Sequence, residues 1–189
     1  MTEAESGLSA LRKQKLLHLF RLIDVNRNGY IERDDLKNMV SRIAFAREIG
    51  ETDDNRILLE ETLTRLWERL APLTDTNFDG HVTHAEWLAL FEHASSERVF
   101  YEGIVRPIEV ALINLIDTDG NGRITYSDYR EMVLAWNVNE SELSHMFRLI
   151  DLDRNGRISR VEAEKAIREF FMSDEDLPGN WFFGDYQRT

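Results

Sequence analysis

The sequence of 189 residues predicts an all-α protein in which four helix–loop–helix units join in two pairs to form one compact body. Three observations support this fold. A twelve-residue pattern with Asp first and Gly sixth occurs four times along the chain. Apolar residues recur at helical spacing around these windows. The eighth residue of each window is β-branched, which favours a short antiparallel bridge between paired loops. The windows are residues 24–35, 75–86, 117–128 and 151–162.

The helices of the first half follow from their apolar stripes. Residues 16–23 carry apolar side chains at positions i, i+3, i+4 and i+7, which predicts a helix entering the first loop. Residues 36–43 repeat the stripe on the exit side, and Gly50 is expected to end that helix. Capping oxygens in residues 52–55 precede a third stripe over residues 63–70. This stripe predicts the helix that enters the second loop.

Proline and serine residues mark expected helix ends in the middle of the chain. Pro72 is expected to close the third helix, and residues 87–94 carry the stripe of the fourth. Residues 95–96 are serines and begin the expected connector between halves. Pro107 lies where the next helix should run, so a break or kink is expected over residues 103–106, with the proline in a first helical turn. The expected divisions are an N-terminal pair (9–95), a C-terminal pair (96–172) and an aromatic tail docked on the body (173–189).

The last unit has the clearest local signals for a helix start. Asn139 and Glu142 have the spacing of a capping box before one helix. Ser159 and Glu162 repeat this spacing at the end of the fourth loop. The same two side chains therefore serve a helix start and the loop chemistry.

The four windows offer the donor set of a hard divalent cation, which takes six to eight oxygens. Each has side-chain oxygens at positions 1, 3, 5, 9 and 12, and the carbonyl at position 7 adds another. Glycine at position 6 turns the backbone sharply without a Cβ clash. One such window arises by chance on the order of once in a million, so turn chemistry alone does not explain four. The candidate metal ligands are Asp24, Asn26, Asn28, Tyr30, Glu32 and Asp35; Asp75, Asn77, Asp79, His81, Thr83 and Glu86; Asp117, Asp119, Asn121, Arg123, Thr125 and Asp128; and Asp151, Asp153, Asn155, Arg157, Ser159 and Glu162.

With these loops the chain resembles EF-hand proteins, and within them the sarcoplasmic calcium-binding protein group with its calexcitin and calerythrin relatives. The first two loops begin 51 positions apart, at Asp24 and Asp75, whereas the last two begin 34 apart. This long first interval is similar to that group and unlike the calmodulin type. Residues 178–184, PGNWFFG, resemble the group's Gly-Asn-aromatic-Gly tail. Members commonly have a degenerate loop, whereas all four are complete here.

The residue at position 12 divides the loops into two kinds. Glu86 and Glu162 can reach an ion with both carboxylate oxygens, which suits the high coordination number of calcium. Asp35 and Asp128 are one methylene shorter, which favours the lower, octahedral coordination of magnesium. We therefore expect tight calcium binding at the second and fourth loops and weaker or magnesium binding at the first and third. The first ranks last, because its positions 3 and 5 are neutral asparagines.

Composition limits the possible partners and the compartment. The formal net charge of -12 suits a cation binder and disfavours nucleic acid. The chain has no cysteine, which excludes disulfides and thiolate chemistry. Its N-terminal region lacks the apolar stretch of a signal peptide, so the expected location is cytoplasmic. We expect a monomer with calcium ions as its ligand, no membrane anchor and no dedicated protein target.

Three functions remain open, and a calcium and magnesium buffer is the first of them. A calcium sensor would open to expose a Met-rich groove, but only four methionines follow Met1. An apolar-ligand protein or coelenterazine-type photoprotein would use the aromatic residues as a cavity lining rather than as a filled core. Catalysis has no support, because no phosphate-binding loop or nucleophile motif occurs and the acids are committed to the cation loops.

Overall fold

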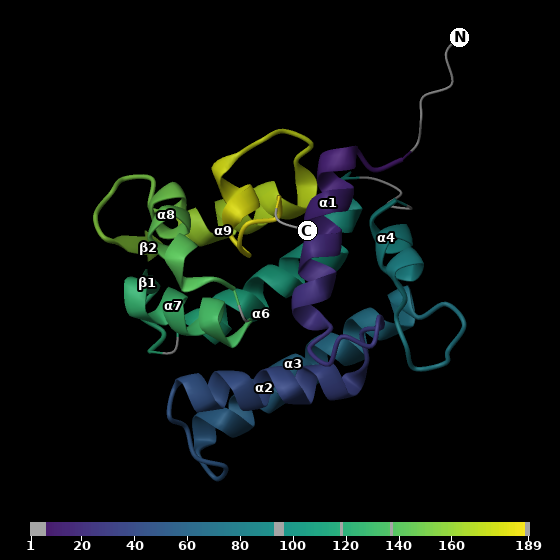
Figure 1. Ribbon diagram of the computed structural model, residues 1–189, viewed down its shortest axis with the longest axis horizontal. Coiled ribbons are helices and arrows are strands. Elements are labelled where there is room, and N and C mark those ends of the chain that lie inside the picture. The colour runs from purple at the N-terminus through teal and green to yellow at the C-terminus, as the bar shows by residue number, and fades with distance from the viewer. Residues whose placement is uncertain (1–6, 93–96, 118, 137, 188–189) are drawn as a thin grey trace.

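The computed structural model describes residues 7–92, 97–117, 119–136 and 138–187. Figure 1 shows helices packed around one core, with loops at the edges. In chain order the elements are α1 (Ala10–Ile23), α2 (Arg33–Ala46), α3 (Asp54–Thr74), α4 (His84–Glu92), α5 (Glu97–Phe100), a π-helix (Tyr101–Val105), α6 (Arg106–Ile116), β1 (Arg123–Thr125), α7 (Tyr126–Ala135), α8 (Glu140–Ile150), β2 (Arg157–Ser159), α9 (Arg160–Met172) and a 3-10 helix (Pro178–Trp181).

The loops meet in two pairs, as the β-branched residue at position 8 predicts. In the first half, Ile31 and Val82 exchange two backbone hydrogen bonds of 2.9 Å in an isolated antiparallel bridge. In the second half β1 pairs with β2 antiparallel, and Ile124 lies opposite Ile158. All four side chains are buried. The all-α fold of four paired helix–loop–helix units is therefore confirmed.

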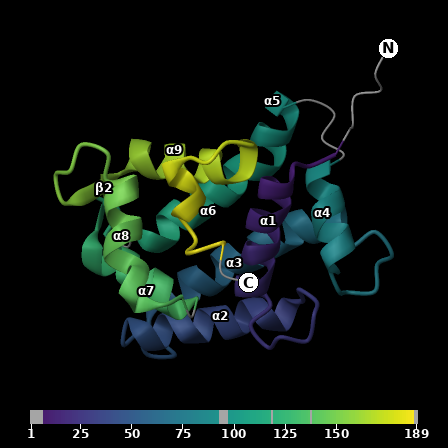
Figure 2. The same ribbon diagram turned by 45° about the horizontal axis from the view of Figure 1, so that its top comes forward.

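The two halves pack against each other through several helices. Contacts join α2 to α7, α1 to α9 and α3 to α6, and Figure 2 shows α2 and α3 on one side of α1 and α6. Arg47, just past α2, donates to the Leu115 carbonyl at 2.8 Å and lies 3.3 Å from Glu131. The expected boundary at residues 95–96 lies outside the described residues.

Two helices end where the residue pattern did not predict. α2 ends at Ala46 rather than at Gly50. Glu48 takes the left-handed conformation with φ 56°, and the Ile49 N–H bonds to the Ala44 carbonyl at 2.8 Å, as in a Schellman C-cap. A non-glycine residue thus fills the position that usually selects glycine, so Gly50 as the terminator was wrong.

Pro72 does not end its helix as expected. α3 continues past Pro72 to Thr74. The last turn survives because the Asp75 N–H still reaches the Ala71 carbonyl at 2.8 Å and the Thr74 hydroxyl donates to the Leu70 carbonyl at 3.0 Å. Before Pro107 the chain forms a π-helix rather than a break, and Pro107 lies in the first turn of α6, where the sequence predicts it. The wider turn of the π-helix accommodates the change in backbone hydrogen bonding that the proline causes.

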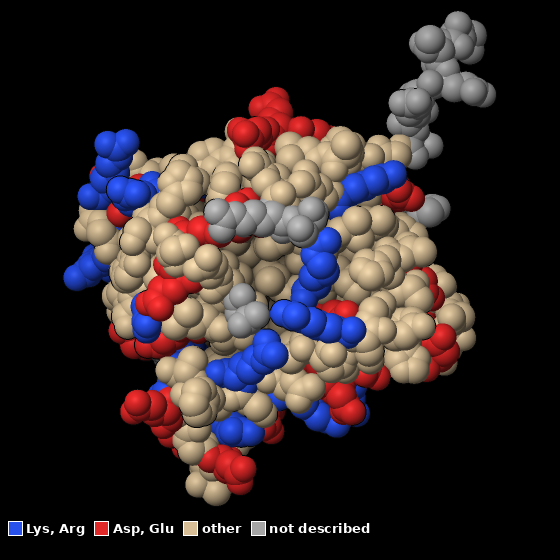
Figure 3. Space-filling view, viewed as in Figure 1, with Lys and Arg blue, Asp and Glu red and all other residues tan. Residues whose placement is uncertain are grey.

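The surface mixes charges of both signs. On the face shown in Figure 3, basic side chains run across the middle and acidic ones lie to both sides. Exposed pairs such as Arg130 with Glu140 at 2.6 Å and Arg160 with Glu164 at 3.0 Å add little stability each. Among the described residues, no helix combines the length and apolar character needed to cross a membrane. Because the surface ion pairs add little stability, the fold must be stabilised mainly by its core.

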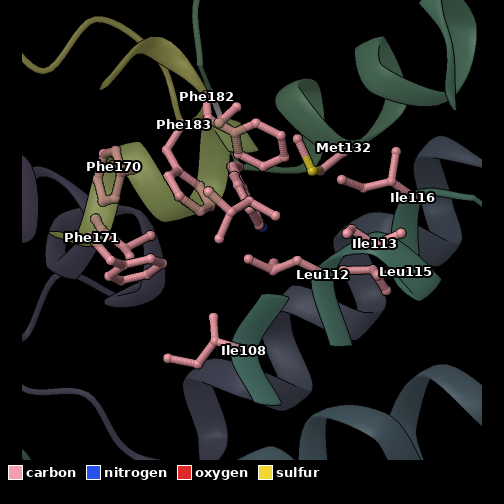
Figure 4. Packing of buried hydrophobic residues seen from close by; sticks show 14 of the residues in the cluster. Ile108, Leu112, Ile113, Leu115, Ile116, Met132, Phe170, Phe171, Phe182 and Phe183 are labelled. Carbon is pink, nitrogen blue, oxygen red and sulfur yellow. The ribbon is translucent and has the colours of Figure 1, made fainter. Parts of the chain in front are cut away.

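The C-terminal tail supplies two of the most buried side chains of that core. Phe182 and Phe183 are fully buried. Figure 4 shows them beside Phe170 and Phe171 of α9, opposite the apolar residues of α6. The ring of Phe183 lies 4.6 Å from that of Phe170, and the carbonyl of Phe182 accepts the Tyr129 hydroxyl at 2.8 Å. The tail is thus part of the packed interior.

A buried lysine holds the tail to α1 and to the end of α9. The Lys15 ammonium donates to the Glu169 carbonyl at 3.2 Å, the Ser173 carbonyl at 2.9 Å and Asn180 Oδ1 at 2.7 Å. The carbonyls at the end of α9 carry the negative end of the helix dipole, which favours a cation there. Gly179 is required beside Asn180, because a Cβ would clash with the backbone of Ala166. These contacts explain the Gly-Asn pair of the tail.

Replacing Lys15 with Met should remove a pH-dependent part of the stability. Burial lowers the pKa of Lys15 from 10.5 to about 8. Between these values the unfolded chain binds more protons than the folded chain, so the wild-type free energy of unfolding should rise with pH relative to Lys15→Met. Denaturant unfolding of the calcium-saturated proteins below pH 8 and near about pH 10 measures this difference.

The matched control is Lys13→Met, because Lys13 lies on the same helix, is 45% exposed and is only 3.5 Å from Glu92. That variant should follow the wild-type pH dependence. A constant stability difference between wild type and Lys15→Met across the whole window would contradict the assigned titration.

Candidate metal-binding loops

All four loops share the turn that brings their donors together. The carboxylate at position 1 accepts the N–H of the glycine at position 6 at 2.9 Å in every loop. These glycines have φ between 76° and 88°, a range that side chains with a Cβ rarely adopt. They are Gly29, Gly80, Gly122 and Gly156. The repeated turn places positions 1, 3 and 5 on the inside of each loop.

Side chains at positions 3 and 5 are oriented by the backbone. The oxygen at position 3 accepts the N–H two residues later in all four loops, at 2.9–3.1 Å. The oxygen at position 5 does the same for Asn28, Asp79 and Asn155, at 2.9–3.0 Å. Such Asx turns hold one oxygen of each side chain while its remaining lone pairs stay free for a cation.

The fourth loop brings its acids closest together. Oxygens of Asp151, Asp153 and Glu162 lie within 4.8 Å of one another. Glu162 begins α9 and closes the loop, because its Oε1 accepts the Leu152 N–H at 2.8 Å and its Oε2 accepts the Ser159 N–H at 2.8 Å. Burial opposes ionisation of Glu162, but hydrogen bonds outweigh it and lower its pKa, first among them the bond from the Ser159 hydroxyl at 2.7 Å. The loop has the donor set that a divalent cation requires.

In the second loop, the glutamate at position 12 also accepts hydrogen bonds from both ends of the loop, and two threonine hydroxyl groups are among the donors. Glu86 Oε1 accepts the N–H and hydroxyl of Thr76 at 3.1 and 3.0 Å, and Oε2 accepts those of Thr83 at 3.0 and 2.9 Å. The Thr83 backbone bond is the main cause that lowers the pKa of Glu86 to about 2. Thr76 was missed by reasoning from the ligand positions, although a hydroxyl residue at position 2 of the loop is a usable signal.

In the first loop a shorter acid also spans the ends. Asp35 Oδ1 accepts the Val25 N–H at 3.0 Å, and its Oδ2 accepts the Glu32 N–H at 3.0 Å. Asp35 is fully buried, and burial raises its pKa. The amides of Asn26 and Asn28 donate to Glu32 Oε1 at 3.0 and 2.8 Å. The short acid at position 12 therefore bonds to backbone N–H groups at both ends of the first loop.

The third loop also has a short acid at position 12. Asp128 Oδ2 accepts the N–H and hydroxyl of Thr125 at 2.8 and 2.6 Å; Thr125 is exposed, whereas Asp128 is half-buried. At the other end Asp117 Oδ1 is buried and has no hydrogen-bond partner within the described part of the chain. A buried carboxylate oxygen without a donor is unfavourable, and a cation would satisfy it. The donors of this loop therefore fit a metal.

Positions 7 and 9 connect the loops within each pair. The rings of Tyr30 and His81 lie 5.3 Å apart, and His81 Nε2 is 3.3 Å from Glu32 Oε2 in the partner loop. In the second pair the strand register places Arg123 opposite Ser159 and Thr125 opposite Arg157. The two loops of each pair are therefore in direct contact.

Comparison with protein families matches three parts of the chain to EF-hand descriptions. An EF-hand domain pair matches residues 13–91, a single EF hand matches residues 110–133, and a second EF-hand domain pair matches residues 131–162. Together these matches cover parts of all four loops.

Individual relatives and solved structures are similar over longer stretches. The alpha chain of a sarcoplasmic calcium-binding protein from Penaeus vannamei is 25% identical over 112 residues, and one from Scylla paramamosain is also 25% identical over 112 residues. Each match spans 58% of this chain and 58% of the relative, so the chain spans somewhat over half the length of these relatives. The amphioxus sarcoplasmic calcium-binding protein superposes with a TM-score of 0.74 at 18% identity, covering 95% of this chain and 99% of that one.

Two further solved structures share the fold. The coelenterazine-binding protein from Renilla muelleri has a TM-score of 0.69 at 19% identity and covers 98% of this chain and 99% of that one. A Streptomyces coelicolor calcium-binding protein has a TM-score of 0.66 at 23% identity and covers 85% and 97%. At these identities the likeness is one of fold.

Proposed function

Because this chain is an EF-hand protein similar to the sarcoplasmic calcium-binding proteins, we propose that it is a calcium and magnesium buffer. The proposed protein is a cytoplasmic monomer that binds ions through its loops, has no catalytic activity and needs no protein target. Its formal charge of -12 makes the acids repel one another, so bound cations should stabilise the fold as well.

The observation that carries this proposal is that both apolar grooves already have an occupant from the same chain. A sensor exposes such a groove to a target helix, whereas a buffer barely opens. In the C-terminal half the tail places Phe182 and Phe183 in the core. In the N-terminal half, α6 packs against α3, and Leu112 and Leu115 of α6 are buried. A target helix would have to displace these segments first.

We assign the tightest calcium binding to the fourth and second loops, whose glutamates hold both ends of the loop. The third and then the first are assigned weaker calcium or magnesium binding. The proposed ligands are those of positions 1, 3, 5, 7, 9 and 12 in each loop. Support for the division comes from the shorter acids at position 12 of the first and third loops, Asp35 and Asp128, since a shorter acid favours the lower coordination of magnesium.

Lengthening the acid of the third loop should make it a calcium site. Asp128→Glu is expected to raise calcium affinity of that loop roughly tenfold and to weaken magnesium competition, because both carboxylate oxygens can then reach the ion. Calorimetric titration with and without magnesium measures both effects. Asp128→Asn, with similar size and no charge, should bind more weakly than wild type. Calcium binding by Asp128→Glu no tighter than wild type would count against the assignment.

A calorimetric calcium titration of the metal-free protein, repeated in millimolar magnesium, tests the buffer proposal. Nanomolar binding at two or more sites that magnesium weakens is the expected result. Micromolar, cooperative binding indifferent to magnesium would favour a sensor. Calcium-dependent retention of the protein on a hydrophobic matrix would also favour a sensor.

The photoprotein alternative rests on fold likeness to the coelenterazine-binding protein. The cavity among the apolar helices has a volume of about 100 Å³, whereas pockets for drug-sized ligands measure about 300–1,000 Å³. This difference favours the buffer. Native mass spectrometry of the purified protein would reverse that choice if a large organic molecule remained bound.

A further inference from the structure

We propose that Arg47 is a positioning residue that couples the first and third loops across the two halves of the molecule. The inference rests on the proposed function, because it takes these loops to be cation sites. It goes beyond the pairing of loops within each half, since the first loop pairs with the second and the third with the fourth. Both coupled loops end in an aspartate at position 12, Asp35 and Asp128.

The helices that leave these two loops pack against each other. Asp35 lies in the first turn of α2, and Asp128 lies in the first turn of α7. The helices α2 and α7 are in contact between the halves and lie beside each other in Figure 2. Each exit helix carries the acid that closes its own loop. A displacement of one exit helix therefore acts on the other and on the acid that it carries.

Arg47, which follows the last residue of α2, joins this helix to both helices of the third unit. Its side chain is only 8% exposed. Its Nη2 donates to the Leu115 carbonyl at 2.8 Å, and its Nε lies 3.3 Å from Glu131 Oε2 as an ion pair without hydrogen-bond alignment. Leu115 lies in the last turn of α6, which enters the third loop, whereas Glu131 lies on α7, which leaves it.

The chemistry of these contacts suits an arginine. Leu115 carries one of the last four carbonyls of α6, which have no partner within the helix and attract a cation through the helix dipole. The planar guanidinium has several donors in fixed directions, so it can contact a carbonyl and a carboxylate at once. The charge of Glu131 offsets that of Arg47. The pair should therefore affect the third loop more by positioning its helices than by repelling a cation.

The route between the loops follows from these contacts. When an ion fills the third loop, Asp117 and Asp128 should close on it and fix α6 relative to α7. Arg47, which contacts both of these helices, then fixes the C-terminal end of α2. This helix is continuous over 14 residues, or about 21 Å. An ion in the third loop should therefore hold Asp35 where it closes the first loop, and the cation affinity of the first loop should rise.

A thermodynamic cycle tests this coupling in the full chain, by heteronuclear NMR during a chelator-buffered calcium titration. The Gly29 N–H donates to Asp24 and the Gly122 N–H to Asp117, both at 2.9 Å, so their resonances report occupancy of the first and third loops. Asp117→Asn should empty the third loop, which is proposed to fill before the first. It should raise the calcium midpoint of Gly29 roughly three- to tenfold. In an Arg47→Met background the same change should shift that midpoint by less than about twofold.

The cycle separates coupling from the lost charge, because both members of the second comparison carry Arg47→Met. Arg42→Met is the matched control, since Arg42 is exposed on the same helix, and it should keep the wild-type coupling. Glu131→Gln leaves Arg47 in place and removes the ion pair with α7. It should also lose most of the coupling. Because Glu131 is partly exposed, this variant tests the bridge even if Arg47→Met does not fold.

The possible results separate this inference from the proposed function. Absence of the shift in the wild type, or retention of the full shift by Arg47→Met or by Glu131→Gln, overturns the coupling while leaving the loops as cation sites. A wild type in which Gly122 never responds to calcium overturns the third-loop assignment and the coupling together. If the first loop fills before the third, the cycle is run with Asp24→Asn and read at Gly122, where the same shift and the same losses are expected.

Discussion

Replacing Glu162 with Gln is expected to weaken calcium binding at the fourth loop by about 100-fold or more. Residues that merely orient a metal ligand cost about 10–100-fold when changed, and Glu162 is itself the proposed bidentate ligand. It also joins the two ends of the loop, through Leu152 at 2.8 Å and Ser159 at 2.8 Å. Glutamine removes the charge and turns one acceptor oxygen into a donor.

Calorimetry resolves this loss as the disappearance of one tight site. Glu164→Gln is the matched control, because Glu164 lies two residues further along α9 and pairs on the surface with Arg160 at 3.0 Å. This control makes the same change in charge and should keep the tight site within about twofold of wild type. Tight fourth-loop binding retained by Glu162→Gln would refute the ligand assignment.

A second consequence of Glu162→Gln concerns the partner loop. Ile158 of the fourth loop lies opposite Ile124 of the third, within the paired strands β1 and β2. If the fourth loop no longer closes around its ion, β2 should be held less rigidly against β1. Third-loop affinity should therefore fall as well, although less than that of the fourth, because the two loops share this ladder.

The loops and their pairing could be predicted from the sequence because every constraint lies within twelve residues. Gly156 must turn the chain, Asp151 must face inward, and Ile158 must point to the core, and each requirement selects a residue type directly. The antiparallel pairing of Ile124 with Ile158 followed from those requirements alone. Short-range chemistry determines these features.

Features that depend on distant contacts were not predictable in the same way. Lys15 carries no signal in its own helix that it will donate to Asn180, which lies 165 positions away. Glu48 adopts the left-handed conformation although its residue type does not favour it. The continuation of α3 past Pro72 likewise depends on Thr74 and on where the second loop must begin. Tertiary packing overrides the local preferences in these cases.

The reach of position 12 shows the limit of reasoning from side-chain length. Asp35 and Asp128 have the same length, yet Asp35 is fully buried and bonds across its loop, whereas Asp128 is only half-buried. Asp35 accepts the backbone N–H groups of Val25 and Glu32, which lie at opposite ends of its loop. The same residue type at position 12 therefore has different surroundings in the two loops. This difference can be recognised only when the structure of each loop is known.

Phe183→Ala is expected to destabilise the calcium-saturated protein by about 3–5 kcal/mol, the usual cost of truncating a buried phenylalanine. The Phe183 ring is fully buried and lies 4.6 Å from Phe170 and 5.2 Å from Trp136. Its carbonyl bond to His18, at 3.0 Å, does not depend on the ring and should persist. Denaturant unfolding measures the loss.

The matched control is Phe45→Ala, because Phe45 is 87% exposed and its truncation should change stability by no more than about 0.5 kcal/mol. Phe183→Ala should also bind a hydrophobic matrix when calcium is present, whereas the wild type should not, since removing the ring opens the space that the tail fills. Destabilisation of less than about 1 kcal/mol would show that the ring is not a core anchor. Matrix binding by the wild type and the variant alike would mean that the tail leaves the groove when calcium binds, and the buffer assignment would then give way to a sensor.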